Sequence, residues 1–451
     1  MIKKILIANR GEIASRIIRT CKRLGITSVA VYSEADRDAP FVKSADEAYL
    51  LGDPPVHQSY MNMDRLFEIA KAAKVDAIHP GYGFFSEHAP FRKRSEQEGI
   101  IFIGPTAEVI GKMGDKINAR KTMAEAGVPI VPGSEQKITD VETAVAKAEQ
   151  IGYPLMLKAA AGGGGIGMHV VQDRAELEKV FTNVSERAQR LFGDGSMFIE
   201  KKIENAHHIE IQILADEFGN IVHLFDRECS IQRRNQKIIE EAPSPFISEQ
   251  TREKMAIAAV KAAKAIHYTN VGTIEFLVDE EENFYFLEMN TRIQVEHPVT
   301  EEITGMDLVE WQIRIANQEV LPFEQKDIVR DGHAIEVRIY AEDPVRFFPS
   351  PGRITSVKLP EGEGVRHDIG FKENFQVTPF YDPMIGKLIV KGDSREEALK
   401  RLDTALKTYE IEGIKTNLPM LEKTVTIPAF QQGKTTTDFV ETHYLPIASK
   451  I

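Results

Sequence analysis

Short apolar runs and amphipathic segments alternate along the first hundred residues. The apolar runs, typical of short buried strands, occupy residues 3–9, 27–33, 75–81 and 100–105. Residues 11–25 place four apolar side chains on one helical face and end at a glycine, and residues 63–74 also have a helical pattern. Strands that alternate with helices predict a parallel, doubly wound sheet, so we expect a Rossmann-like α/β domain here.

The pattern changes after about residue 108. Predicted helices cover residues 114–128 and 250–268, predicted strands residues 153–158 and 168–171, and a predicted β-hairpin residues 271–290. From about residue 331 the chain is β-rich, and a helix at residues 394–409 closes this block. We therefore expect an α/β and α+β protein with domains at residues 1–113, 114–330 and 331–446.

Composition restricts the class of protein. The chain has 451 residues, of which 42% are hydrophobic and 27% are charged, as in multidomain globular proteins. A net charge of −12 argues against general nucleic-acid binding, so local clusters of cations must meet any anionic ligand. No apolar run approaches the roughly 20 residues of a membrane span, and two cysteines suit a reducing compartment. We expect a cytoplasmic protein that binds neither nucleic acid nor a membrane.

Residues 288–296 carry Glu, Asn, Arg, Gln and Glu at every second position, so a strand here would place five polar groups on one face. In the predicted hairpin, pairing Asp279 with Phe284 puts Glu275 opposite Glu288, about 5 Å apart at Cβ. Two carboxylates at that distance repel by about 3 kcal/mol. A divalent cation would offset this repulsion, with Asn290 as a further oxygen ligand; the alternative is a solvated acidic edge.

A glycine-rich stretch, AAAGGGGIG at residues 159–167, lies between two predicted strands. Consecutive glycines let backbone N–H groups approach phosphates closely, and Lys158 is placed to reach a phosphate. The stretch lacks the Gly-Lys-Ser/Thr of a P-loop, so we predict a mobile flap over a nucleotide, with a flexible linker as the alternative. The single glycine of NRGEIA makes no dinucleotide fingerprint, so NAD is not expected.

Residues 227–237 are basic in an otherwise acidic chain. Their cations are Arg227, Arg233, Arg234 and Lys237. Clustered guanidinium and ammonium groups bind small oxyanions, although a solvated basic face is the alternative. His208 alternates with isoleucines and predicts a polar strand face, and Lys116 carries no local signal beyond that of a surface lysine.

A set of motifs, taken in order, resembles the biotin carboxylase family: NRGEIA, HPGYGF, FIGP, MGDK, the four-glycine loop, IEKKIENAHHIEIQ, CSIQRRNQK, EEAPSP, EMNTRIQVEHPVTEEITG, RIYAEDP and FYDPMIGKLI. The resemblance spans essentially the whole chain, and EMNTRIQVEHPVTE is its most specific part. It implies an ATP-grasp central domain with a lid at about residues 131–204. It also implies a reaction in which ATP, bicarbonate and a biotinyl carrier give ADP, phosphate and a carboxybiotinyl carrier.

The same resemblance implies roles for individual residues. Those expected to bind ATP are Lys116, Lys158, Gly164, Gly165, Glu200, Lys201, Ile203, His208, Gln232, Asn235, Glu275 and Glu288. Those expected to hold Mg²⁺ or Mn²⁺ are Glu275, Glu288 and Asn290. Bicarbonate is expected to bind Lys237, Arg292, Gln294 and the Val295 backbone. Glu296 would be the base that deprotonates bicarbonate, and Arg338 would stabilise the enolate-like ureido oxygen of biotin.

Two positions depart from the family pattern. Ile166 stands where the bacterial acetyl-CoA carboxylase component has Arg, and Asn235 stands where the family has His. Asparagine keeps a hydrogen-bonding group but not a protonatable ring. No Ala-Met-Lys-Met biotin acceptor is present, and Lys387 in MIGKL is interpreted as part of a sheet core. The expected partners are therefore a separate biotin carboxyl carrier protein, carboxyltransferase subunits and a second copy of the chain; the alternative is that the sequence is a domain excised from a larger carboxylase.

The leading interpretation is the biotin carboxylase of an acetyl-CoA carboxylase, which supplies malonyl-CoA for fatty acid synthesis. A methylcrotonyl-, propionyl- or pyruvate-type carboxylase would perform the same half-reaction with different partners. An ATP-grasp ligase for another acid is disfavoured because the bicarbonate and biotin residues occur together. A non-catalytic, regulatory ATP-binding protein is disfavoured by the presence of Glu288 and Glu296.

Overall fold

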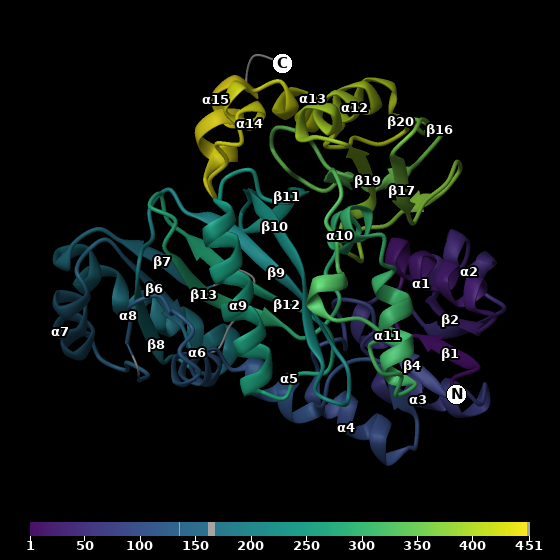
Figure 1. Cartoon of the computed structure of the whole chain (residues 1–451), viewed down its shortest axis with the longest axis horizontal. Coiled ribbons are helices and arrows are strands. Elements are labelled where there is room, and N and C mark those ends of the chain that lie inside the picture. Colours follow the sequence, from purple (N-terminus) through teal and green to yellow (C-terminus); the bar gives the residue numbers. More distant parts are fainter. Residues whose placement is uncertain (135, 161–166, 449–451) are drawn as a thin grey trace.

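The computed structural model describes residues 1–134, 136–160 and 167–448 (Figure 1). Its first part is a five-stranded parallel sheet in the order β3-β2-β1-β4-β5, which confirms the predicted parallel sheet. Its elements are β1 (Lys4–Ile7), α1 (Gly11–Leu24), β2 (Thr27–Ser33), α2 (Pro40–Ser44), β3 (Glu47–Gly52), α3 (Met63–Ala72), β4 (Ala77–His79), α4 (Ala89–Gln97) and β5 (Ile101–Phe102). Helix α1 ends where predicted, because Gly25 adopts the left-handed conformation that closes the helix.

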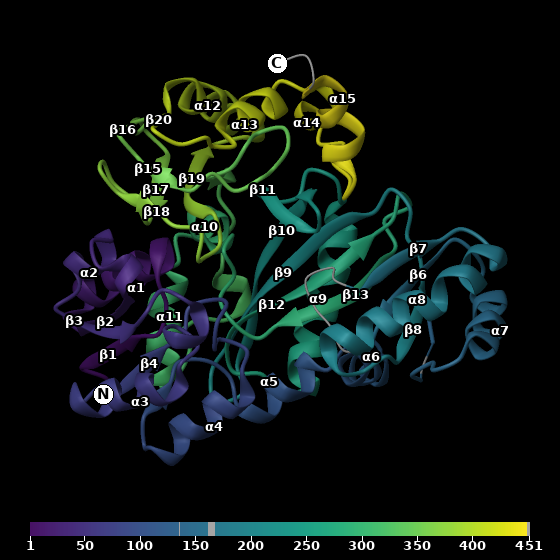
Figure 2. The ribbon, with the colours of Figure 1, turned by 180° about the vertical axis from the view of Figure 1, so that it is seen from behind.

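An eight-stranded antiparallel sheet runs through the middle of the molecule in the order β13-β12-β9-β10-β11-β14-β19-β17 (Figure 2). Its strands are β9 (His207–Ala215), β10 (Ile221–Arg233), β11 (Gln236–Ala242), β12 (Asn270–Val278), β13 (Phe284–Asn290), β14 (His333–Tyr340), β17 (Val365–Ile369) and β19 (Met384–Gly392). Strand β11 of the predicted central domain pairs with β14 of the predicted C-terminal domain, so the two domains share one sheet. Helices that accompany it are α5 (Ala107–Gly114), α6 (Lys116–Glu125), α9 (Glu249–Ala265), α10 (His297–Thr304) and α11 (Leu308–Ala316).

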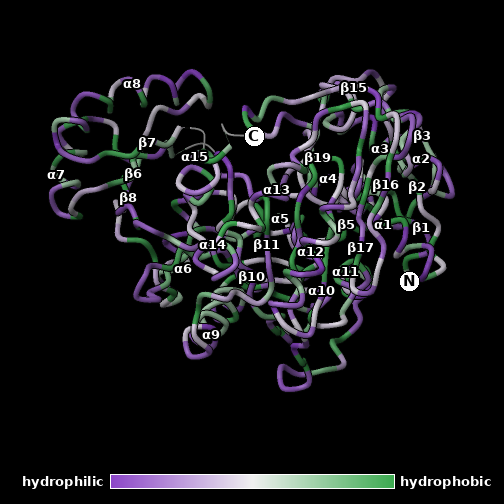
Figure 3. The backbone as a smooth tube through the Cα atoms, turned by 90° about the horizontal axis from the view of Figure 1, so that it is seen from above, coloured by the Kyte–Doolittle hydropathy of each residue, from purple (hydrophilic) through white to green (hydrophobic). Residues whose placement is uncertain are grey.

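A smaller three-stranded sheet, β7-β6-β8, forms a separate unit at one end of the molecule (Figure 3). The unit as a whole consists of α7 (Val141–Ile151), β6 (Leu155–Ala159), β7 (Met168–Val171), α8 (Arg174–Phe192) and β8 (Met197–Lys201). Its two helices pack together over the sheet and bury a cluster of their own that includes Leu157, Leu177 and Ile199. The unit lies within residues 131–204, where a lid is predicted. The four-glycine flap and Ile166 lie outside the described residues.

The C-terminal region adds short strands and several helices to β14, β17 and β19. These are β15 (Gly352–Arg353), β16 (Ser356–Lys358), β18 (Gln376–Val377), α12 (Arg395–Thr408), β20 (Glu410–Glu412), α13 (Leu418–Val425), α14 (Pro428–Gln431), a π-helical turn (Val440–Tyr444) and α15 (Leu445–Ala448). Helix α12 confirms the helix predicted at residues 394–409, but the expectation that it closes this block is wrong, because further helices follow it. The later helices are short, and prolines at the start of α13 and α14 divide the pattern.

The expectation of a strand through residues 288–296 is also wrong. Strand β13 ends at Asn290, and α10 begins at His297 with Pro298 in its first turn. At Thr291 the backbone N–H donates to Glu87 at 3.0 Å instead of extending the ladder with β12. Residues 291–296 therefore form a loop, which we call the post-strand loop.

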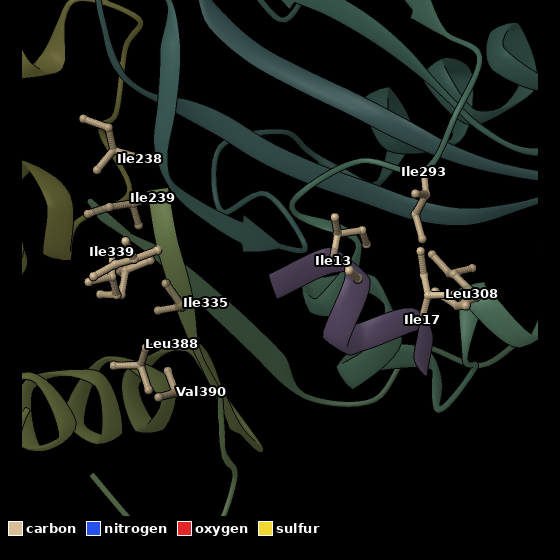
Figure 4. Packing of buried hydrophobic residues seen from close by; sticks show 14 of the residues in the cluster. Ile13, Ile17, Ile238, Ile239, Ile293, Leu308, Ile335, Ile339, Leu388 and Val390 are labelled. Atoms are coloured by element: carbon tan, nitrogen blue, oxygen red, sulfur yellow. The ribbon is translucent and has the colours of Figure 1, made fainter. Parts of the chain in front are cut away.

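One hydrophobic core joins the three regions of the chain. Figure 4 shows Ile13 and Ile17 of α1 beside Ile293 and Leu308, so the post-strand loop is anchored against the N-terminal domain. The same cluster includes side chains from β11, β14 and β19. Among the described residues, the helices are all too short or too polar to span a membrane.

Candidate active site

A cavity of about 890 Å³ lies where the three regions meet. It brings together the predicted site residues that the structure describes: Lys116, Lys158, Glu200, Lys201, Ile203, His208, Gln232, Asn235, Lys237, Glu275, Glu288, Asn290, Arg292, Gln294, Val295, Glu296 and Arg338. Gly164 and Gly165 lie outside the described residues. Positions separated by more than 200 residues in the sequence thus line one cavity. Their individual roles remain predictions.

The β12–β13 hairpin places Glu275 opposite Glu288, as predicted, although the register near the turn differs. Val278, not Asp279, pairs with Phe284, and a β-bulge after Glu275 restores the predicted pairing further along the strands. The Asn290 amide donates to Glu275 at 3.0 Å. The bulge changes the direction of the side chains that follow it. Counting residues from the turn does not reveal such a bulge.

The two opposed carboxyls are in different electrostatic states. For Glu275, burial favours the neutral form, but Lys237 and then His208 outweigh it and hold the pKa well below its usual range. For Glu288, burial and the charge of Glu275 raise the pKa, and Lys116 only partly offsets them. The Glu288 side chain is exposed on the cavity wall, where a ligand can reach it. An opposed pair of this kind, with an amide oxygen beside it, fits a divalent cation.

Lys237 joins three carboxylates from different elements. Its ammonium lies 2.7 Å from Glu210 on β9, 2.8 Å from Glu275 on β12 and 2.6 Å from Glu296 at the end of the post-strand loop. Burial favours the neutral amine, but the three carboxylates outweigh it, and the pKa of Lys237 is raised well above its ordinary value. Lys237 is therefore a permanent buried cation at the centre of the cavity wall.

Glu296 is held by two cations. Its oxygens accept from Lys237 at 2.6 Å and from the Arg338 guanidinium at 2.9 Å. Burial would raise the pKa of Glu296, but Lys237, Arg338 and Arg227 outweigh it and lower the pKa below its usual range. Arg338 also donates to Glu240 at 2.6 Å. The pKa of Glu240 is raised to about 7, chiefly by burial.

The wall near Lys158 differs in its construction. Lys158 on β6 pairs with Glu200 on β8, and Glu200 also accepts from Arg120 of α6. His208 lies 2.9 Å from Glu275 and is hydrogen-bonded to Gln232 at 2.9 Å. Burial lowers the pKa of the Lys116 ammonium, an effect that the charge of Glu288 opposes. A half-buried lysine beside acidic groups is a suitable phosphate ligand.

Asn235 occupies the tight turn between β10 and β11. Arg233 pairs with Gln236, and the two residues between them, Arg234 and Asn235, have φ of 51° and 63°. Two consecutive left-handed residues define a type I′ hairpin turn, in which asparagine is strongly favoured. Asparagine at this position is therefore compatible with the local backbone, and its side chain lines the cavity.

The predicted oxyanion cluster within residues 227–237 is largely wrong. Arg227 is fully buried and donates to Glu210 at 2.5 Å, and Arg233 is bonded to Glu342. Of the four cations in this stretch, Lys237 is the one that lines the cavity. The alternation of strand side chains and the β-bulges in β10 direct the two arginines into the protein, where carboxylates neutralise them.

Three acidic residues near the site are absent from the predicted set. Glu210 contacts Lys237, Glu240 contacts Arg338, and Glu87 lies 2.9 Å from Arg292. The sequence carries Glu240 within EEAPSP and Glu210 on a polar strand face, which are usable signals. Glu87 is 205 residues from its partner and has no local signal.

Comparisons with known proteins agree with this architecture. Models of the biotin carboxylase N-terminal domain, the carbamoyl-phosphate synthase L chain ATP-binding domain and the biotin carboxylase C-terminal domain match residues 1–110, 115–324 and 336–442. The fold and the site thus define an ATP-dependent ligase of the ATP-grasp class. At 62% identity over 443 residues, the chain is similar to biotin carboxylase 2 of Bacillus subtilis, covering 98% of this chain and 100% of that protein. The chain belongs to the biotin carboxylase family.

Other relatives belong to different carboxylases. One of the subunits of the pyruvate carboxylase of Methanothermobacter thermautotrophicus is 53% identical over 442 residues, covering 98% of this chain and 90% of that protein. Among solved structures, the biotin carboxylase domain dimer of Hydrogenobacter thermophilus 2-oxoglutarate carboxylase, in complex with MgADP, ADP and bicarbonate, is 49% identical. Its TM-score is 0.95, and the match covers 98% of each chain.

Proposed function

We propose that this chain catalyses the ATP- and bicarbonate-dependent carboxylation of biotin carried on a separate biotin carboxyl carrier protein. The observation that supports this most directly is the position of Glu296 between Lys237 and Arg338 at the meeting point of three regions. In this arrangement Glu296 supplies a base, Lys237 an anion site and Arg338 a cation for the biotin ring. Hydrogen bonds link the three side chains. The family membership supports the same reaction.

The first step joins bicarbonate to the γ-phosphoryl group of ATP. Bicarbonate binds Lys237 and Arg292, and thereby competes with Glu296 for its cations. As these contacts weaken, the pKa of Glu296 rises toward its ordinary value, and its carboxylate accepts the bicarbonate proton. The bicarbonate oxygen attacks the γ-phosphorus, the bond to the β-phosphate oxygen breaks, and carboxyphosphate and ADP form.

The second step transfers CO₂ to biotin. Carboxyphosphate separates into CO₂ and phosphate, and the phosphate accepts the proton of the ureido nitrogen. Arg338 stabilises the resulting enolate-like oxygen, and the nitrogen attacks CO₂ to form carboxybiotin. Since Arg338 already contacts Glu296 at 2.9 Å, the two steps occur side by side.

Glu275, Glu288 and Asn290 would hold Mg²⁺ or Mn²⁺, because their oxygens suit a hard cation and Glu275 and Glu288 lie opposite each other at the cavity wall. The metal ion would neutralise charge on the phosphates of ATP. Lys116 and Lys158, which line the same cavity, bind these phosphates. Glu200, Lys201 and Ile203 contact the adenine, with His208, Gln232 and Asn235 nearby.

The test is ADP release with Mg²⁺ and ATP, with bicarbonate and free biotin each added or omitted. We expect ADP release to require bicarbonate and to rise when biotin is added. ATP binding with no response to either addition would contradict the proposal. In that case a regulatory ATP-binding protein, or a ligase for another acid, becomes the better explanation.

We further propose that the complete complex is an acetyl-CoA carboxylase with separate carboxyltransferase subunits, in which this chain is a homodimer. The identity to a biotin carboxylase of full matching length supports this. The identity to part of a pyruvate carboxylase favours a second candidate, in which the same half-reaction serves pyruvate. Co-purification of the native complex, followed by assays with acetyl-CoA and with pyruvate, distinguishes them. The cytoplasmic location remains a prediction.

A further inference from the structure

Lys387 is an unusual residue for its surroundings. It lies on β19, the strand MIGKLIVKG, and is followed by three apolar residues that are all fully buried. The lysine itself is 0% exposed. Burying an ammonium group is costly unless specific partners compensate it, so its contacts call for a functional explanation.

The contacts of Lys387 join three distant segments of the chain. Its Nζ donates to the carbonyl oxygen of Val295 at 2.6 Å, in the post-strand loop. The same Nζ lies 3.3 Å from Glu12 Oε1 at the start of α1. Glu12 in turn accepts a hydrogen bond from the hydroxyl of Tyr82. The motifs NRGEIA, HPGYGF and FYDPMIGKLI, which the active-site chemistry leaves largely unused, therefore converge on one carbonyl group.

Charge compensation accounts for part of this burial, because Lys387 offsets the buried carboxyls of Glu12 and Glu336. Asp368 pairs directly with Lys387 across β17 and β19, but its carboxylate already accepts from Arg19 at 2.7 Å and from Arg366 at 2.8 Å. The hydrogen bond to Val295 is shorter than the contact with Glu12. The carbonyl is thus a principal partner of the ammonium group.

The post-strand loop requires this support. Its residues follow the end of β13 and precede α10, so they lie outside the sheet ladder. Thr291 is bonded to Glu87, and Ile293 packs beside Ile13 (Figure 4). Lys387 fixes the third point, the peptide group between Val295 and Glu296. The direction of this peptide sets where the Glu296 carboxyl points.

The backbone is shaped to bring Glu12 to this position. A Cβ atom added to Gly370 would lie 2.7 Å from the Glu12 nitrogen and 2.8 Å from the Gly11 carbonyl carbon. The start of α1 therefore rests directly on the turn after β17, with no room for a side chain. This close approach places the Glu12 carboxyl against β19.

We propose that Lys387 is a positioning residue for bicarbonate activation: it holds the Val295 carbonyl and thereby orients Glu296, while Glu12 and Tyr82 hold the ammonium group. This proposal rests on the proposed function, since it assigns Glu296 to bicarbonate. It predicts that the N-terminal and C-terminal regions both act on the base through one buried side chain.

The experiment compares Lys387→Met, Glu12→Gln and Leu388→Ala with the wild type. Met preserves most of the lysine volume and removes the donor, and Gln preserves the shape of Glu12 and removes its charge. Leu388 neighbours Lys387 on β19 and is equally buried, so its truncation destabilises the same strand and leaves the Val295 contact intact. Bicarbonate KM and kcat, ATP affinity, and hydrogen exchange of residues 291–296 are measured for each protein.

For Lys387→Met we expect bicarbonate KM to rise about tenfold or kcat to fall about tenfold, with ATP affinity within about twofold of wild type and faster exchange at residues 291–296. Glu12→Gln should give the same pattern with smaller changes, and it decides the matter if Lys387→Met does not fold. Leu388→Ala should lower the melting temperature and leave bicarbonate KM unchanged.

Two results would overturn the proposal with the proposed function intact. One is an unchanged bicarbonate KM, kcat and exchange rate in both substituted proteins; the other is a parallel loss of ATP and bicarbonate affinity, matched by Leu388→Ala. If wild-type ADP release is independent of bicarbonate, the proposed function itself fails, and this inference fails with it.

Discussion

The two ends of the cavity are built differently. At the end where we propose that bicarbonate binds (the bicarbonate end), Lys237 and Arg338 project from strands of one eight-stranded sheet, and each is bonded to Glu296. At the nucleotide end, Lys158 and Glu200 belong to the separate three-stranded sheet, and Lys116 begins helix α6. One rigid sheet therefore pre-organises Lys237 and Arg338, and the post-strand loop holds Glu296 against them. The nucleotide end depends on how two units are placed relative to each other.

This difference has a chemical consequence. Under the proposed function, a small anion that enters the bicarbonate end replaces existing ion pairs, so we expect its binding and the activation of the base to be coupled. A nucleotide that enters the other end meets Lys116, whose pKa is lowered by burial and only partly restored by Glu288, and Lys158, which is paired with Glu200. Substitutions at the two ends should therefore affect different kinetic quantities.

The largest separation is expected for Glu296→Ala. Removing the base should lower bicarbonate-dependent ADP release by about 10³-fold, the scale of general-base catalysis, with ATP affinity preserved. Steady-state kinetics and nucleotide titration measure the two quantities. Glu241→Gln is a matched control. Like Glu296, Glu241 is buried and paired with an arginine, but its partners, Arg395 and His333, lie outside the cavity. Normal turnover of Glu296→Ala would contradict its role as base.

Arg338→Ala should be nearly as damaging, but for a different step. Loss of the guanidinium removes stabilisation of the ureido oxygen, so biotin carboxylation should fall by about 10²-fold. ATP affinity should change by less than about threefold, because Arg338 contacts Glu240 and Glu296, away from the nucleotide end. Carboxybiotin formation from labelled bicarbonate gives the rate. An equal loss of both quantities would count against the assignment.

The sequence predicts much of this site because strand alternation and hairpin geometry are local. The hairpin follows from its local pattern, although the pairing of Glu275 with Glu288 also depends on a β-bulge that the sequence does not reveal, and the helix that ends before Gly25 follows from its apolar spacing. The parallel sheet follows from the order of strands and helices. Each of these features depends on residues close together in the chain.

The failures have a common physical origin in distant contacts. Alternation alone predicts a strand through residues 288–296, but Glu87 draws Thr291 away from the ladder. The roles of Lys116 and Arg338 can be inferred only through family resemblance, since no local pattern marks them. The arginines at 227 and 233 resemble an anion site in the sequence because their buried carboxylate partners are far away along the chain.

Neighbouring glutamates on β11 should respond to pH with opposite signs. Burial raises the pKa of Glu240 to about 7, so its contribution to stability is present below its unfolded value near 4.5 and is lost as pH rises through 7. Glu240→Gln should therefore gain stability relative to wild type between pH 5 and pH 8, on the order of 2 kcal/mol. Denaturant unfolding at the two pH values measures this gain.

Glu241 supplies the control for that measurement. Burial favours its neutral form, but His333 and Arg395 outweigh this and lower the pKa of Glu241. Its contribution is present above the unfolded value and is lost as pH falls, so Glu241→Gln should lose stability at pH 8 and approach wild type in acid. Parallel pH profiles for the two substitutions would show that their environments do not differ as the structure indicates.

A smaller effect, confined to the nucleotide end, is expected for Lys116→Met. Loss of one phosphate contact should weaken ATP binding by about tenfold, which corresponds to about 1.4 kcal/mol. Bicarbonate KM should stay within about twofold of wild type, because Lys116 lies on α6 and not on the eight-stranded sheet. Isothermal titration with a non-hydrolysable ATP analogue gives the affinity. A comparable rise in bicarbonate KM would show that the two ends are coupled more tightly than their construction indicates.

The smallest effect is expected for Asn235→His, which restores the residue typical of the family. Both side chains tolerate the left-handed backbone at φ 63°, so the type I′ turn and the β10–β11 register should persist. Histidine adds a protonatable ring at the cavity wall, so ATP KM should change by less than about threefold and acquire a weak dependence on pH near 6.5. Measuring ATP KM between pH 6 and pH 8 tests this. A tenfold or larger change would mean that this turn of the eight-stranded sheet determines nucleotide affinity. The nucleotide end would then depend on the rigid sheet as well, and the contrast between the two ends would be smaller than we propose.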